Sequence, residues 1–84
     1  MIIVSQDKGK IINFDNMTRV YITFDEGDDD VCIRAETVDS LYEDLGYYKT
    51  EGRAKEVLAE ITEFWKNGAM SDYKGFICYE MPED

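Results

Sequence analysis

Carboxylic acids dominate one short stretch of this chain, FDEGDDD, which begins at Phe24. Five of its seven side chains are acids, namely Asp25, Glu26, Asp28, Asp29 and Asp30. Such a run can bind a divalent cation, meet a basic partner, or form a solvated turn. Closely spaced carboxylates repel one another, so a cationic partner would stabilise them.

The spacing of the acids tests for a calcium-binding loop. If Asp25 takes position one of a twelve-residue loop, Glu36 falls at the bidentate position twelve. However, Gly27 then stands at a ligand position, and Asp30 stands at position six, where glycine makes the sharp turn. The spacing therefore predicts no metal site. A solvated hairpin tip is the simpler interpretation, and a contact with a basic partner is the functional one.

A second set of acids falls on one stripe of an expected helix. Glu56, Glu60 and Glu63 are spaced four and three residues apart, which places neighbouring carboxylates about 5–6 Å from one another along one face. This row can imitate phosphates, although an ordinary solvated helix face is the simpler interpretation. Together with the acid run, the three glutamates form the partner-binding surface that the sequence predicts.

Basic and aromatic residues suggest an alternative ligand site. The candidates are Arg19, Arg34, Tyr47, Tyr48, Lys49 and Arg53. The bases could hold phosphates and the tyrosines could stack on a nucleotide base at a seam between copies. Thr50 and Gly52, at the start of the expected helix, could add backbone donors for an anion. The simpler interpretation places the tyrosines in a small core with their hydroxyl groups at its rim.

Composition limits the functional classes. The chain has 84 residues, which predicts a single domain over 1–84. It has 19 acids, 9 bases and a net charge of −10. This charge disfavours direct binding of nucleic acid or an anionic membrane and favours a basic protein partner. It contains no histidine and no catalytic or phosphate-cradling motif, so we expect no enzyme and no cofactor.

The cysteines and the hydropathy pattern predict a cytoplasmic protein. Cys32 and Cys78 lack the spacing of a redox or metal motif, so we expect both to be buried or half-buried structural thiols. No apolar stretch approaches the roughly 20 residues that span a bilayer. The first residues lack the charged and apolar regions of a signal peptide.

Alternating apolar residues predict strands at 2–4, 10–14, 17–24, 31–37, 43–49 and 76–81. Gly9 is expected to take a positive φ in the first hairpin, and the acid run forms the tip of the third-to-fourth strand hairpin. A helix is expected at about 51–66, with Thr50 as its N-cap and Asn67 and Gly68 at its end. Its apolar stripe contains Ala54, Val57, Leu58, Ile61, Phe64 and Trp65.

The predicted fold is α+β: a curved antiparallel sheet of about five to six strands with one helix packed on one face. Within the third strand, Val20, Ile22 and Phe24 share one face. Val31, Ile33 and Ala35 share a face of the fourth strand. The opposite sheet face carries Arg19, Tyr21, Thr23, Cys32, Arg34 and Glu36. We expect it to meet water, a partner or a second copy of the chain.

Three segments resemble a group of small prophage-borne proteins of Firmicutes whose function is undefined. They are MIIVSQDKGKIINFDN at the start, YYKTEGRAKEVLAEI in the middle and YEMPED at the end. The resemblance implies a phage setting, in which small acidic proteins often inhibit host defence. It implies a non-catalytic, anti-CRISPR-like protein that presents an acidic surface to a basic nucleic-acid-binding groove. The alternatives are an oligomeric sponge for a nucleotide immune signal and a homo-oligomeric accessory phage protein.

Overall fold

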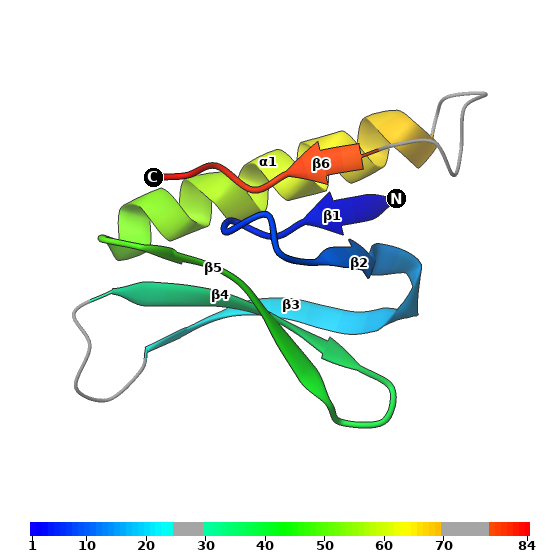
Figure 1. Ribbon diagram of the computed structural model, residues 1–84. Helices are drawn as coiled ribbons and strands as arrows, with labels where there is room; N and C mark the ends of the chain where they lie inside the picture. The colour runs from blue at the N-terminus through cyan, green and yellow to red at the C-terminus, as the bar shows by residue number, and fades with distance from the viewer. Residues whose placement is uncertain (25–29, 70–77) are drawn as a thin grey trace.

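A computed structural model describes residues 1–24, 30–69 and 78–84. The element order is β1 (Ile2–Val4), β2 (Ile11–Asn13), the short 3-10 helix η1 (Phe14–Asn16), β3 (Met17–Phe24), β4 (Val31–Thr37), β5 (Tyr42–Tyr48), α1 (Glu51–Ala69) and β6 (Cys78–Glu80) (Figure 1). The α+β class is confirmed. The helix is longer than expected: it continues past residue 66, so Asn67 and Gly68 lie inside α1.

The strands form two small sheets, so the single curved sheet is not confirmed. One sheet has the order β2-β1-β6 and the other the order β3-β4-β5. All neighbours are antiparallel except β1 and β6, which are parallel. A long crossover makes parallel pairing possible, and here β2 to β5 and α1 separate the two strands in the chain.

The first hairpin differs from expectation at one residue. Lys8 takes the left-handed conformation, with φ of 61°, where Gly9 was expected to do so. The turn is held by Asp7 Oδ1, which accepts hydrogen bonds from the Ser5 hydroxyl at 2.7 Å and from the Gly9 N–H at 2.9 Å. These bonds lower the pKa of the Asp7 carboxyl. The hydrogen bonds to Asp7 therefore stabilise a turn in which Lys8, rather than a glycine, has the left-handed conformation.

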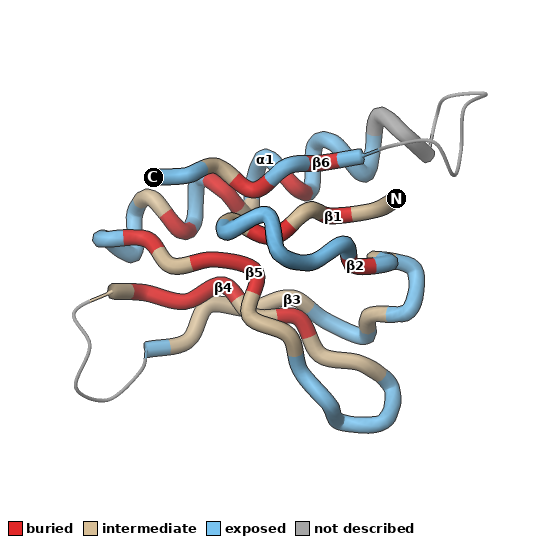
Figure 2. The backbone as a smooth tube through the Cα atoms, in the orientation of Figure 1, coloured by how far each residue is buried: buried red, intermediate tan, exposed pale blue. Residues whose placement is uncertain are grey.

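The core lies between α1 and the two sheets (Figure 2). It contains Ala54, Val57 and Ile61 of α1, Val31, Ile33, Ala35, Leu45 and Tyr48 of the β3-β4-β5 sheet, and Ile3, Ile12 and Tyr79 of the β2-β1-β6 sheet. The helix contacts β3, β4 and β5. The expected inward face of β4 is thus confirmed, as is the central part of the helix stripe.

Three aromatic side chains expected on apolar faces are exposed instead. Phe64 is 40% exposed and Trp65 49% exposed, because they lie at the margin of the buried stripe of α1. Phe24 is 62% exposed at the end of β3, whereas Val20 and Ile22 are packed against the core. The periodicity identified the apolar side of β3 and of α1. Packing against the sheets decided which residues on that side are buried, and Phe24, Phe64 and Trp65 are not.

Candidate functional site

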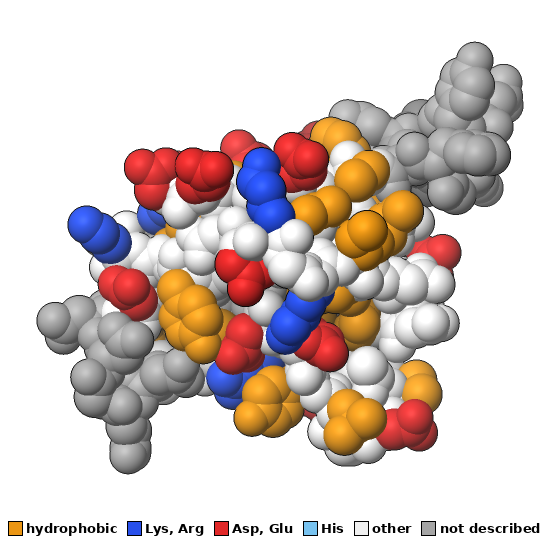
Figure 3. Space-filling model, in the orientation of Figure 1, with side chains coloured by type: hydrophobic (Ala, Val, Ile, Leu, Met, Phe, Trp, Pro, Cys, Tyr) orange, Lys and Arg blue, Asp and Glu red, His pale blue; other side chains and the backbone are white. Residues whose placement is uncertain are grey.

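An acidic groove lies between the helix and the last strand. We call this hollow of about 520 Å³ the α1–β6 groove; it is lined by Ala59, Glu60, Glu63, Phe64, Tyr79, Glu80 and Pro82. Figure 3 shows hydrophobic side chains next to acidic ones over β6 and the neighbouring part of α1. The groove thus combines an apolar floor with three carboxylates.

Tyr79 and Glu60 hold the floor of the α1–β6 groove in place. The Tyr79 side chain, on a residue that is 7% exposed, donates its hydroxyl hydrogen bond to Glu60 Oε2 at 2.8 Å. The Phe64 ring packs edge-on against Tyr79, with ring centroids 5.3 Å apart, an arrangement that aromatic pairs prefer. Burial, followed by the bond to Glu60, raises the pKa of the Tyr79 hydroxyl. These contacts fix the position of the Tyr79 ring between Glu60 and Phe64.

The charges around the α1–β6 groove favour a cation. Glu63 lies 3.9 Å from Lys66 Nζ, and both side chains are more than half exposed, so this pair contributes little. Glu80 forms no ion pair with any residue in 1–24, 30–69 or 78–84. Among the described residues, a cationic side chain entering the groove would thus meet Glu63, which has only this weak pair, and Glu80, which has no ion pair, whereas Glu60 already accepts the Tyr79 hydroxyl bond.

The predicted acidic residues do not all gather here. Glu60 and Glu63 line the α1–β6 groove, but Glu56 lies outside it and pairs with Arg53 at 3.1 Å. Asp30 lines a different hollow, and Asp25, Glu26, Asp28 and Asp29 lie outside the described residues. The sequence did not indicate Phe64, Tyr79, Glu80 and Pro82 as site residues. Their approach depends on where β6 docks, and no local pattern encodes that.

Four of the six alternative ligand residues meet at the start of the helix. The helix-start hollow, also about 520 Å³, is lined by Gln6, Asp30, Tyr47, Tyr48, Lys49, Arg53, Glu83 and Asp84. Its three carboxylates oppose an anionic ligand. Arg53 Nε already donates to the Asp84 carbonyl at 3.0 Å.

The tyrosines of the helix-start hollow are also engaged. Tyr48 is 1% exposed and donates its hydroxyl hydrogen bond to the Pro82 carbonyl at 2.8 Å. Burial raises the pKa of Tyr48 to about 12. Its ring is therefore part of the core and cannot stack on a base.

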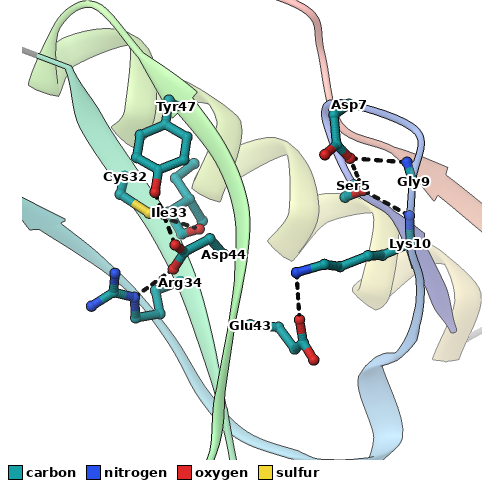
Figure 4. A network of polar contacts seen from close by, with 10 residues as sticks. All are labelled: Ser5, Asp7, Gly9, Lys10, Cys32, Ile33, Arg34, Glu43, Asp44 and Tyr47. Carbon is teal, nitrogen blue, oxygen red and sulfur yellow. Dashed lines mark hydrogen bonds and ion pairs between the residues drawn. The ribbon is translucent and has the colours of Figure 1, made fainter.

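Arg19 and Arg34 lie elsewhere, on the sheet face that turns away from α1. Arg34 Nε donates to Asp44 Oδ1 at 2.6 Å, and Tyr47 donates to Asp44 Oδ2 at 2.9 Å (Figure 4). The bond from Arg34, followed by that from Tyr47, lowers the pKa of Asp44 against the effect of its burial. Arg34 also stacks on the Tyr42 ring at 4.3 Å.

Arg19 has a similar environment. Its guanidinium pairs with Glu36 Oε2 at 2.7 Å and lies 4.5 Å from the centre of the Tyr21 ring. Each arginine of this face thus already has a carboxylate and an aromatic ring as partners. The six alternative ligand residues do not form one site.

The described residues were also searched for a metal site and for a membrane-spanning helix. Within residues 1–24, 30–69 and 78–84, no three histidine, cysteine, aspartate or glutamate side chains gather to hold a metal ion. In the same ranges, no helix is long and apolar enough to cross a membrane.

Comparisons of the chain with protein-family models, with curated proteins and with solved structures found no match. The class of protein is therefore defined by the described fold: a small α+β protein in which one α-helix packs on two three-stranded sheets.

Proposed function

We propose that this protein is a non-catalytic binding protein whose α1–β6 groove takes a basic, partly apolar segment of another protein. The observation that carries this proposal is the combination of three carboxylates, Glu60, Glu63 and Glu80, with an apolar floor formed by Phe64 and Tyr79. An aliphatic or aromatic side chain would fill the floor. Lysine or arginine side chains beside it would meet the glutamates.

The charge of the whole chain supports the same partner. A net charge of −10 attracts a basic surface over long range and raises the association rate. Salt weakens such attraction, because it screens exposed charges beyond about 8 Å at physiological ionic strength. Binding should therefore be strongest at low salt.

In the setting that the sequence resemblance implies, the partner is a host-defence factor. Its basic nucleic-acid-binding groove would be occupied by this protein, which would thereby act as an anti-CRISPR-like inhibitor. The recognition chemistry is the same as for any basic partner, so the binding mode can be tested before the partner is known.

A synthetic peptide with an apolar centre flanked by lysine and arginine serves as the probe. We expect fluorescence anisotropy to show binding that weakens as NaCl is raised from about 50 to 500 mM. A peptide with the bases replaced by glutamate should not bind. Absence of binding by the basic peptide at low salt, or an affinity that salt does not change, would contradict the proposal.

Two charge-matched variants locate the site. Glu63→Lys changes the charge inside the α1–β6 groove, and Asp39→Lys makes the same change at an exposed turn outside it. We expect Glu63→Lys to weaken the peptide at least about tenfold, since a like charge replaces an opposite one. Asp39→Lys should have a much smaller effect. Equal effects would show that only the overall charge matters.

The nucleotide sponge is the second candidate, because Tyr47, Tyr48, Lys49 and Arg53 do line one hollow. A thermal-shift screen with cyclic nucleotides tests it, since a ligand that binds the folded state raises Tm. A rise of several degrees that Arg53→Ala abolishes would favour the sponge over the protein-binding function.

A further inference from the structure

The outer edge of β3 is open. In the sheet order β3-β4-β5, β3 is an end strand, and no strand in the described ranges pairs with its outer side. In the regular part of this strand, residues 20–24, every second residue therefore directs its N–H and C=O groups away from β4, toward a side where no strand of the described chain lies. An open strand edge is a template for another strand.

β3 carries little of the usual protection against such pairing. Proteins protect edges with lysine, proline, bulges or short strands. The segment MTRVYITF contains no lysine and no proline. Its one charged side chain, Arg19, is held by Glu36 and Tyr21. A register irregularity interrupts pairing only between Met17 and Arg19, so residues 20–24 form a regular edge.

An apolar hollow lies beside this edge, on the side of the helix. The β3-edge hollow of about 370 Å³ is lined by Phe14, Val20, Leu58, Ile61, Thr62 and Trp65. None of these lining residues is charged, and Trp65 is 49% exposed. In a chain with a net charge of −10, two copies repel least where both surfaces are uncharged.

We propose that β3 pairs antiparallel with β3 of a second copy, which forms a two-fold symmetric dimer with a six-stranded sheet. A two-fold axis perpendicular to the sheet keeps both helices on one face. The β3-edge hollow of each copy then faces that of the other, and Trp65 becomes buried at the contact. The occupant is a second copy because the strand is complementary to itself.

The self-complementarity follows from the alternation of β3. With the axis at Tyr21, Val20 of one copy lies opposite Ile22 of the second copy on the helix side. Arg19 lies opposite Thr23 of the second copy on the open side. This register keeps apolar residues on the core face and places no like charges directly opposite one another.

The dimer and the basic-peptide complex respond to salt in opposite directions. Screening weakens the repulsion between two acidic copies and so strengthens the dimer, whereas it weakens attraction for a basic peptide. The inference does not depend on the proposed function, and a failure of either one can be recognised separately.

Analytical ultracentrifugation of the full chain tests the dimer. Over about 5 to 500 µM protein we expect a monomer–dimer equilibrium, because mass action favours the dimer at high concentration. Its Kd should fall when NaCl is raised from about 50 to 500 mM. A monomer under all these conditions, or a dimer that salt weakens, would overturn the proposal.

Two variants and a control identify the surface. Trp65→Lys places a charge in the β3-edge hollow, and Tyr21→Lys places two like charges opposite each other at the axis; each should raise the dimer Kd at least about tenfold. Leu41→Lys, at a residue 67% exposed between β4 and β5, should leave it unchanged. Circular dichroism checks that each variant is folded.

Hydrogen exchange supplies a readout at the strand itself. The outward-pointing amide groups among residues 20–24 should exchange more slowly as protein concentration rises, since pairing with the second copy protects them. A dimer that forms without this protection, or that Leu41→Lys disrupts as strongly as Trp65→Lys does, would place the contact on another surface and reject β3 pairing.

Discussion

The side-chain amide of Gln6 pairs with both backbone groups of Tyr47. Its Oε1 accepts from the Tyr47 N–H at 2.7 Å, and its Nε2 donates to the Tyr47 carbonyl at 2.8 Å. The Gln6 backbone N–H also donates to the Leu45 carbonyl at 2.8 Å. One residue just after β1 thus joins the two sheets and covers part of the outer edge of β5, whereas the outer edge of β3 has no such cover in the described chain.

Replacing Gln6 should destabilise the protein. Gln6→Ala leaves the two backbone groups of Tyr47 without their partner, and also removes the bond from Nε2 to the Glu83 carbonyl at 2.8 Å. We expect a loss of about 1–3 kcal/mol in the free energy of unfolding, measured by urea denaturation. A loss below about 0.5 kcal/mol would show that this link carries no weight.

Gln6→Glu is the matched variant for this contact. An ionised carboxylate can still accept from the Tyr47 N–H. However, it cannot donate to the two carbonyl oxygens, of Tyr47 and Glu83, that accept hydrogen bonds from Gln6 Nε2 in the parent. The variant should therefore be less stable than the parent at neutral pH. It should recover partly near pH 4, since a protonated carboxyl can donate again.

Asp44 should make stability depend on acid pH. Its pKa is lowered in the folded state, chiefly by the bond from Arg34. Its contribution is therefore present above the unfolded pKa of about 3.9 and is lost as pH falls through the lower folded value. We expect Asp44→Asn to lose about 1.5–3 kcal/mol near pH 7, because the charged bonds are removed.

The measurement for Asp44 is the difference between parent and variant in urea denaturation at several pH values. The difference should shrink below about pH 4. Repulsion among the other acids also changes in this range, but it acts on both proteins and largely cancels. Glu36→Gln, which affects the more exposed pair with Arg19, should cost less at neutral pH. A difference that stays constant with pH would contradict the assignment.

Tyr48 should make the protein sensitive to strong base. Burial raises its pKa to about 12 in the folded state, against about 10 when unfolded. Folding favours the neutral phenol, so this contribution is complete below about pH 10 and is lost as pH rises toward 12. Tyrosinate absorbance should show a late ionisation step to which both Tyr48 and Tyr79 contribute. Tyr48→Phe should reduce this step by one phenol and leave the part that belongs to Tyr79.

The two cysteines should differ sharply in reactivity. Cys32 is 0% exposed and its pKa is raised to about 11, first by burial and then by the nearby Asp44, whereas Cys78 is exposed. A thiol reagent should modify one cysteine of the native protein quickly and the other only after unfolding, since the thiolate is the reactive form. Cys78→Ser should abolish the fast reaction. If Cys32 reacts equally fast in the native state, its burial is wrong.

Glu60→Gln separates the two roles of Glu60. The amide oxygen can still accept the bond from Tyr79, so stability should change by less than about 0.5 kcal/mol. The groove nevertheless loses a charge, and the basic peptide should bind about two- to fivefold more weakly at low salt. A large loss of stability without a loss of binding would limit Glu60 to a structural role.

The cysteines illustrate how far sequence reasoning reached. Both thiols were expected to be at least half-buried, which is correct for Cys32 and wrong for Cys78. Cys32 is buried although it lies on the sheet face away from α1. Tyr47 is its cross-strand neighbour, and Asp44 lies close enough to affect its pKa. The alternation of β4 predicted the sheet face on which Cys32 lies. Only the pairing with β5, which places Tyr47 beside it, decided that Cys32 is buried.

In the α1–β6 groove, too, the sequence predicted part of the site and the tertiary structure decided the rest. The spacing of Glu60 and Glu63 placed both side chains on the outer side of the helix, and both do line the α1–β6 groove. Their apolar neighbours Tyr79 and Pro82 come from a segment near the end of the chain. Nothing in the local pattern of either segment encodes their approach.

The sequence by itself predicted the helix, the strands at 2–4, 10–14, 17–24, 31–37 and 43–49 close to their observed bounds, and the strong negative charge. It also predicted the core-facing side of the helix and of the strands at 17–24 and 31–37. These properties depend on residue type and on periods of two and 3.6 residues, which are local. Only the tertiary structure decided that the strands divide into two sheets, that β6 joins β1 in parallel, and that no other strand of residues 1–24, 30–69 and 78–84 pairs with the outer edge of β3. The choice of strand partners depends on packing between segments distant in the chain, and residue periodicity does not contain that information.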